Sequence, residues 1–358
     1  MTTAIAERRL RNQLITKGEA RRPADVVRWF AAVQAQEYDA AKWALGLRMR
    51  AGTLDEEIER AFDRGQILRT HVMRPTWHFV TPADIRWLLE LTSPRVHRAM
   101  SSYTRRFELD RRTLARGTAV IEQALGGGQP LTRTELGDRL KQRGVVMAGV
   151  RLALLTIHAE LEGVVCSGPR RVKRFTYALL EERAPAARRL TRDEALATLS
   201  RRYFSSHGPA TIRDFVWWSG LTTADARRGL EMNSARREDV GDRTYWTLDD
   251  APHRHMRGHL VHLLPIYDEY LVAYRDREAV PHGPSVVGSD GAGSVNFRHA
   301  LVIAGQVAGT WRTARREGRL LAHVTPGRRL TLRERRAIGE AARRYERFLA
   351  TPVELRID

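Results

Sequence analysis

Two glutamines, Gln34 and Gln36, lie between two apolar stretches that have helical spacing. A neutral amide thus stands at each position where a carboxylate would ordinarily serve as a catalytic base. An amide carbonyl is far too weak a base to remove a proton, but it can orient a water molecule and aim its dipole at developing positive charge. The pair therefore indicates catalysis by positioning and by electrostatic stabilisation.

The spacing of the two glutamines requires a break in the helical pattern. In one continuous helix Gln34 and Gln36 would point about 200° apart, because each residue advances a helix by roughly 100°. They would then not share a ligand. We predict one helix over 24–35, opened by a proline, and a second helix over 40–48 with Asp39 as its N-cap. A break near Gln36 would bring both amides together beside a helix end.

Several segments carry a resemblance to a known family. The first is VQAQEYDAAKWALGLR from Val33, followed by RTHVMRPTWHFVTPADIRWLL from Arg69, LLPIYDEYLVAYRDR from Leu263 and ALVIAGQVAGTWR from Ala300. They resemble the winged-helix DNA glycosylases of the AlkZ/YcaQ type, and the first segment has the Gln-x-Gln signature of that family. Together the segments span nearly the whole chain.

The resemblance implies that Gln34 and Gln36 are the catalytic residues. Some relatives have aspartate at the second position, so Gln36 resembles the branch associated with self-protection against DNA-alkylating natural products. Glu37 and Asp39 are nearby carboxylates that would restore an ordinary general-base mechanism, although we favour solvation and N-capping as their roles.

The implied activity is hydrolysis of the N-glycosidic bond of bulky purines alkylated at N7, with interstrand crosslinks as a further substrate. Such a base is already a cation and leaves without a proton, so the enzyme has to orient water and stabilise an oxocarbenium-like sugar. Lys42 is the only lysine in the signature, which disfavours a Schiff base and predicts a monofunctional enzyme without lyase activity. We expect neither a cofactor nor a metal.

A predicted β-ribbon over 67–80, bent at Arg74-Pro75, would supply contacts to DNA. Arginines are the strongest candidates, because contacts to phosphate are the largest class at such interfaces. A strand histidine is as well explained by a structural hydrogen bond. The predicted DNA-binding residues are Lys42, Arg69, His71, Arg74, Thr76 and His78.

The glycine-rich segment that starts at Val280 is longer than a hairpin needs, so it is either mobile or functional. The resemblance implies a β-hairpin that probes the duplex near the lesion. A surface loop without that role explains the composition equally well. The candidate probing residues are Ser289, Asp290, Gly291, Gly293 and Asn296.

The composition favours a polyanionic partner. The 358 residues carry a formal charge of +19, and the phosphate backbone of double-stranded DNA is the commonest polyanion that fits such a surface. Arginine dominates, since only four of the 61 basic residues are lysines, a bias that a GC-rich genome also produces. Cys166 is the only cysteine, which excludes an intramolecular disulfide and a multi-cysteine zinc site.

No apolar run of about 18 residues and no signal segment is found in the sequence, which argues against a membrane partner. We expect a soluble, cytoplasmic, nucleoid-associated monomer without an obligate protein partner. Its substrate would be double-stranded DNA that contains alkylated purines.

The predicted fold is mainly α with β wings. Three stretches each read as two or three amphipathic helices followed by a short ribbon, which is typical of tandem winged-helix (helix-turn-helix) domains. The resemblance adds a C-shaped basic DNA-binding surface. The predicted domains are 1–110 with the Gln-x-Gln pair, 111–185, 186–257, and a β-rich C-terminal region over 258–358 with a hairpin loop and a terminal helix.

Two other groups of polar residues do not indicate catalysis. His255, His259 and His262 lack a nearby ligand motif, so we do not assign a metal site to them. Carboxylates and arginines also cluster in a segment that includes a predicted strand over 271–274, and we interpret them as buried or interfacial ion pairs on paired strands. These residues are Asp268, Glu269, Arg275 and Asp276.

The alternative function is a winged-helix DNA-binding protein or transcription regulator without chemistry. A regulator would prefer one DNA sequence and usually dimerise on paired half-sites. A glycosylase would bind duplexes of any sequence and release the alkylated base.

Overall fold

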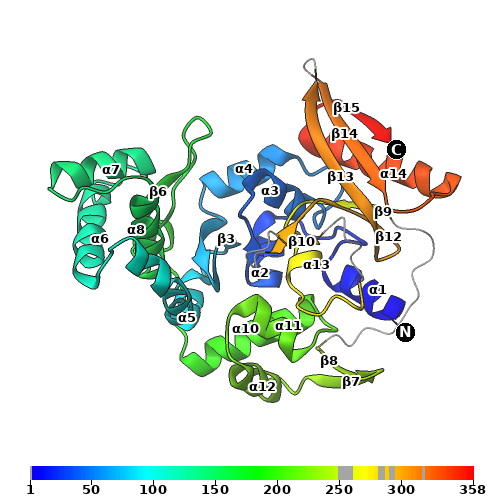
Figure 1. Cartoon of the computed structure of the whole chain (residues 1–358), viewed down its shortest axis with the longest axis horizontal. Coiled ribbons are helices and arrows are strands. Elements are labelled where there is room, and N and C mark those ends of the chain that lie inside the picture. Colours follow the sequence, from blue (N-terminus) through cyan, green and yellow to red (C-terminus); the bar gives the residue numbers. More distant parts are fainter. Residues whose placement is uncertain (1, 249–260, 281–286, 290–294, 317–318) are drawn as a thin grey trace.

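A computed structural model describes residues 2–248, 261–280, 287–289, 295–316 and 319–358 (Figure 1). It is mainly helical, with five small sheets in the described part. The mixed composition of helices and short strands agrees with the predicted class. The winged-helix character of the units and a C-shaped basic surface stay predictions. No helix in the described ranges is long and apolar enough to cross a membrane.

The N-terminal part holds four helices around a three-stranded sheet. The strands run antiparallel in the order β1-β3-β2. The elements are α1 (Thr2–Asn12), α2 (Pro23–Phe30), β1 (Val33–Gln34), α3 (Tyr38–Gly46), α4 (Asp55–Asp63), β2 (Leu68–Val72) and β3 (Arg74–Val80).

The turn between β2 and β3 differs from the prediction. It falls at Met73, which takes a positive φ of 63°, whereas Arg74 and Pro75 already belong to β3. Short hairpin turns favour residues with positive φ, and the sequence signal from proline suggested a later position.

Helix α5 (Ile85–Arg106) is longer than predicted. From the sequence, Pro82 and Asp84 predict a helix that starts here and runs through Leu91, yet the helix continues through Pro94. A proline inside a helix removes one hydrogen bond. Here the helix continues because residues beyond the proline, Val96 and Met100, still pack against a buried core. Tertiary packing therefore overrides the local signal.

The next two units follow the predicted order of helices and ribbons. The first contains α6 (Arg111–Leu125), β4 (Leu131–Thr132), α7 (Arg133–Gln142), α8 (Gly149–Leu161), β5 (Val165–Ser167), β6 (Thr176–Leu179) and α9 (Leu180–Arg183). The second contains α10 (Arg192–Ser206), α11 (Ile212–Ser219), α12 (Thr223–Met232), β7 (Arg236–Val240) and β8 (Arg243–Thr247). A capping box formed by Thr191 and Glu194 begins α10, as the sequence pattern indicates.

The C-terminal region forms a five-stranded sheet in the order β15-β14-β13-β12-β9. Its elements are β9 (Val261–Leu264), α13 (Glu269–Val272), β10 (Val287–Ser289), β11 (Val295–Phe297), β12 (Ala300–Ile303), β13 (Gln306–Arg316), β14 (Arg319–Pro326), α14 (Leu332–Leu349) and β15 (Val353–Ile357).

The strand predicted over 271–274 is wrong, because this segment begins in the short helix α13. Asp268 is its N-cap and accepts the N–H of Tyr270 at 2.9 Å. A capping aspartate stabilises a helix start and competes with an extended conformation. The ion-pair interpretation holds for Asp268, but the pair does not lie on strands.

One hydrophobic core joins segments from the two ends of the chain. Phe30 and Trp43 of the N-terminal helices share a buried cluster with Ile338 and Phe348 of α14. The rings of Trp43 and Phe348 lie 5.0 Å apart. Val33 of β1 and Phe79 of β3 belong to the same cluster, so residues from both ends of the chain support the sheet that carries Gln34. This core contains residues from the first and the last of the predicted domains.

Candidate active site

The two glutamines lie at the end of strand β1 and in the bend that follows it: Gln34 ends the strand, and Gln36 precedes α3. Helix α2 ends where Ala31 takes a positive φ of 71° and leads the chain out of the helix. Gln34 then pairs with His78 of β3, and Ala35 donates its N–H to the carbonyl of Trp77 at 2.7 Å. The side chain of Gln34 contacts Arg74 of β3, and the side chain of Gln36 contacts the main-chain N–H of Trp77 on the same strand.

The predicted helix limits need correction here. Helix α2 ends at Phe30 and not at Ala35, and α3 begins at Tyr38. Its N-cap is Glu37, so Asp39 lies in the first turn and is not the cap. The break exists as predicted, but it is a strand-forming segment and not a simple helix end.

Gln34 is buried, with 7% of its surface exposed. Its main-chain N–H donates to Oε1 of Glu269 at 2.7 Å. Its side-chain carbonyl accepts a hydrogen bond from Nη2 of Arg74 at 3.0 Å. Both ends of this residue are thus held by charged groups from other parts of the chain.

Gln36 is half-buried and lines a cavity of about 430 Å³. Its side-chain oxygen accepts only a long hydrogen bond from the main-chain N–H of Trp77, at 3.5 Å. The wall of the cavity combines cationic, acidic and aromatic side chains. They include Glu37, Tyr38, Asp39, Trp43, Arg69, Arg170, Phe175, His299, Trp311 and Tyr345.

Arg69 clamps the segment that carries the glutamines. Its Nε donates to the carbonyl of Ala35 at 3.0 Å, and its Nη2 donates to the carbonyl of Gln36 at 3.4 Å. The guanidinium lies over the rings of Trp77 and Phe175, at 4.2 and 4.5 Å from their centroids. Burial lowers the pKa of Arg69 to about 10. Arg69 therefore fixes the main chain on either side of Gln36. A phosphate contact by Arg69 stays a prediction.

The two ribbon histidines are buried. His71 contacts the carboxylate of Glu160 through Nδ1. Nδ1 of His78 lies 2.9 Å from the carbonyl of Thr76, and burial lowers the pKa of His78 to about 3. The neutral ring of His78 donates through Nδ1, since a carbonyl can only accept. These positions favour the structural interpretation of both histidines.

Arg74 and Thr76 are the predicted ribbon contacts that keep some exposed surface. Both point to the face of β3 that also carries His78, because alternate residues of a strand share a face. Arg74 reaches the Gln34 carbonyl, whereas the Thr76 hydroxyl has no partner in the described part of the chain.

Lys42 is buried, with 4% of its surface exposed. Its ammonium lies 2.8 Å from Asp55, 2.9 Å from Glu59 and 3.3 Å from Asp39. Burial alone would lower the pKa of Lys42, but the hydrogen bonds to Asp55 and Glu59 raise it above its usual value. Contact with DNA phosphate would require these ion pairs to be replaced, and that prediction stays untested.

The segment predicted as a probing hairpin is flanked by two paired strands. Ser289 ends β10 and pairs with Val295 of β11, and Asn296 pairs with Gly288 in the same ladder. Asp290, Gly291 and Gly293 lie outside the described residues. An antiparallel pair of strands is present at the predicted place, and a role on DNA stays a prediction.

Two contributors to the site were missed in the sequence. Glu269 was grouped with ion pairs, yet it contacts the main chain of Gln34. The β5–β6 loop (168–175) contributes Arg170 and Phe175 to the cavity beside Gln36. The high density of basic residues in that loop was a usable signal, whereas the long-range contact of Glu269 had none.

Other polar clusters lie away from the glutamines. In the described ranges His97, His158 and Glu162 place one ligand atom each within 4.8 Å of one another. A cavity of about 1050 Å³ lies against α11 and the β7–β8 ribbon, where Arg243 pairs with Asp276 and Glu278. Of the three histidines set aside earlier, His255 and His259 lie outside the described residues. His262 is buried, and burial lowers its pKa to about 3.

The family is established by sequence comparison. The model of the DNA glycosylase AlkZ-like family matches residues 27–348, and the chain belongs to this family. It is therefore an enzyme of the DNA glycosylase class.

A curated protein and a solved structure from Streptomyces sahachiroi extend the comparison. The interstrand DNA cross-link repair glycosylase of that organism is 26% identical over 329 residues, which cover 86% of this chain and 87% of the relative. The solved structure of the S. sahachiroi DNA glycosylase AlkZ superposes with a TM-score of 0.81 at 23% identity and covers 99% of each chain. The second likeness establishes a shared fold.

Proposed function

We propose that this enzyme is a monofunctional glycosylase for bulky, cationic N7-alkylpurines in double-stranded DNA. The observation that carries the proposal is that the side chains of Gln34 and Gln36 both contact strand β3, and that Gln36 lines a cavity of about 430 Å³. In the described ranges the cavity contains no lysine. This favours direct hydrolysis over a covalent Schiff base.

The proposed reaction needs little proton transfer. The oxygen of a water molecule forms a bond to C1′ of the deoxyribose while the bond from C1′ to the purine nitrogen breaks. The bonding electron pair moves into the purine and cancels its positive charge, and the water proton passes to solvent. An amide carbonyl supplies orientation of the water and a dipole toward the charged sugar, as a carboxylate does in glycoside hydrolysis.

Binding of the duplex is proposed to rest on phosphate contacts by exposed basic residues. The β5–β6 loop adjoins the cavity and carries a dense basic group, so it joins Arg74 and Thr76 as a candidate surface. Arg69, His71, His78 and Lys42 are buried and would contribute mainly by shaping the site. The exposed basic residues of the loop are Arg171, Lys173 and Arg174, whereas Arg170 is largely buried and pairs with Glu59.

Unhooking of interstrand crosslinks is part of the proposal. The S. sahachiroi relative is named as an interstrand DNA cross-link repair glycosylase. A crosslinked base cannot rotate freely into a closed pocket, so a site near the surface of the duplex suits such a substrate. The β10–β11 pair would support a hairpin that probes the lesion. The biological role would be repair or self-resistance to a genotoxic product.

The test uses a duplex that contains N7-methylguanine as the smallest cationic probe. Wild-type protein should convert the lesion into a heat-labile abasic site without cutting the strand, and Gln36→Ala should lose this activity by about 100-fold or more. Exposed Arg22→Met is the matched control and should keep it. Equal yields from wild type and Gln36→Ala would remove Gln36 from the mechanism, and strand cleavage before heating would contradict a monofunctional enzyme.

A further inference from the structure

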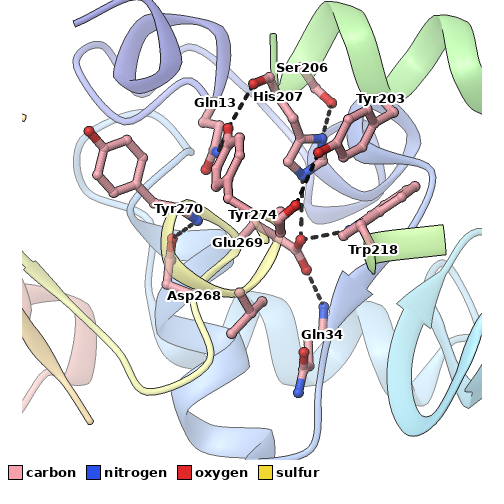
Figure 2. A network of polar contacts seen from close by, with 12 residues as sticks. Gln13, Gln34, Tyr203, Ser206, His207, Trp218, Asp268, Glu269, Tyr270 and Tyr274 are labelled. Atoms are coloured by element: carbon pink, nitrogen blue, oxygen red, sulfur yellow. Dashed lines mark hydrogen bonds and ion pairs between the residues drawn. The ribbon is translucent and has the colours of Figure 1, made fainter. Parts of the chain in front are cut away.

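Gln34 lies between a carboxylate and a guanidinium. On one side Glu269 accepts the Gln34 main-chain N–H through Oε1 at 2.7 Å (Figure 2). The other oxygen of Glu269 accepts from Nε1 of Trp218 at 2.9 Å and lies 3.4 Å from Nε2 of His207. Glu269 is fully buried and so has a fixed orientation.

On the other side Arg74 determines which way the Gln34 amide faces. A guanidinium has only donors, so the atom that it contacts at 3.0 Å is the carbonyl oxygen of the amide. The NH₂ group of Gln34 therefore points away from Arg74. A carbonyl that already accepts from a cation is a poor acceptor for a second positive charge, because the two charges repel.

Gln36 is in the opposite situation. Its carbonyl receives a neutral main-chain N–H at 3.5 Å, which is the outer limit of a hydrogen bond. No cationic group in the described part of the chain donates to this side-chain oxygen. Gln36, unlike Gln34, also lines the cavity.

We propose that Arg74 and Glu269 are positioning residues that assign different roles to the two glutamines, an inference that rests on the proposed function. Arg74 and Glu269 hold Gln34 so that it presents its NH₂ group as a donor to an acceptor on the substrate. Gln36 is the acceptor that faces the attacking water and the charged sugar. The two amides of the signature are therefore not interchangeable.

The charges of the two positioning residues support each other. Burial alone would raise the pKa of Glu269, but hydrogen bonds from His207 and from the Gln34 N–H lower it below its usual value. Burial lowers the pKa of Arg74, and the attraction of Glu269 opposes this change. An anion and a cation at opposite ends of one residue fix its orientation more firmly than neutral groups do, because the low dielectric of the interior strengthens both contacts.

A positioning role for Arg74 competes with a role as a phosphate contact, and kinetics separate the two. A phosphate contact contributes to affinity and to the salt dependence of binding, so its loss reduces the slope of log K against log salt by about one. A positioning contact contributes to the rate at saturating enzyme. A misplaced catalytic group costs on the order of 100-fold in rate.

The experiment measures single-turnover base release and duplex affinity for variants of both positioning residues. Arg74→Met should lower the saturated rate on the N7-methylguanine duplex by about 10- to 100-fold, while the salt slope stays that of wild type. Arg74→Lys should recover part of the rate, because an ammonium can still donate to the Gln34 carbonyl. Glu269→Gln keeps an oxygen acceptor but lacks the charge, and it should lower the rate without changing affinity.

Thermal unfolding of each variant separates loss of rate from loss of fold, and Arg22→Met again serves as the control. If wild type is active and Arg74→Met has the same saturated rate, the positioning role is overturned while the proposed function stands. A reduced salt slope with an unchanged rate would do the same and would assign Arg74 to phosphate. A wild type that releases no base would overturn the proposed function and this inference with it.

Discussion

Among individual residues, the proposed chemistry depends on amide groups and not on titrating ones. Gln34 and Gln36 do not ionise, and two histidines beside them are held neutral by burial. The pKa of His78 is lowered to about 3, and that of His299, in the cavity wall, to about 4. Neither ring gains a proton between pH 5 and pH 8. The catalytic rate should therefore not follow the titration of either histidine.

A pH profile tests this expectation. We expect the saturated single-turnover rate of wild type to be flat from about pH 5 to pH 8, because the proposed chemistry uses no group that changes its charge in this range. Gln36→Asp introduces a carboxylate that works only when ionised, so its rate should fall as the pH drops through the pKa of that group. A wild-type rate that rises through a single pKa near 6.5 would show that a titrating base takes part.

The sequence alone indicates which residues to consider, but not their environments. The Gln-x-Gln signature singles out Gln34 and Gln36 as candidates. The same sequence could not reveal that Lys42 would be enclosed by three carboxylates or that the Arg69 guanidinium would stack on two aromatic rings. Those contacts join residues from separate helices and strands, and no local pattern records them.

Among the helices and strands, the short segment β1 is positioned by neighbours from distant parts of the chain. Strand β3 supplies its hydrogen bonds, and α13 supplies Glu269. Helix α13 is itself fixed by Asp268, which forms a two-point ion pair with the buried Arg48 at 2.8 Å. A substitution of Asp268 should therefore lower the free energy of unfolding more than it lowers the catalytic rate.

Replacing Asp268 tests this support. In Asp268→Asn the charge of buried Arg48 loses its counterion, and we expect a loss of about 3–5 kcal/mol in the free energy of unfolding, measured in urea. Asp25→Asn removes the exposed partner of Arg22 and should cost under about 1 kcal/mol. Similar losses in both variants would contradict a special role of the Arg48 pair.

Element predictions from the sequence were right where local signals decide the structure. Periodicity predicts helices over 112–125, 134–143 and 150–162, which match α6, α7 and α8 to within one residue at each end. The capping box at Thr191 correctly predicts where α10 begins. The predictions were wrong where distant contacts decide the structure, at Pro94 in α5 and in the short helix α13. Strand β15 was missed because it is completed only by parallel pairing with β14.

Across the molecule as a whole, the positive charge favours binding to DNA but does not select the lesion. The formal charge of +19 favours any duplex, which suits a repair enzyme that must accept every flanking sequence. Selectivity must then come from the lesion. Gln34 and Gln36 offer no acid that could protonate a departing base, so the lesion has to supply the positive charge itself.

Lesions that differ in charge provide the decisive comparison. Single-turnover base release should be measured on one duplex sequence that contains either cationic N7-methylguanine or the neutral base hypoxanthine. We predict rapid release of N7-methylguanine and release of hypoxanthine that is slower by at least about 100-fold, because a neutral purine leaves poorly without a proton. Release of both bases at comparable rates would contradict the proposal that two uncharged amides suffice only for a base that is already a cation.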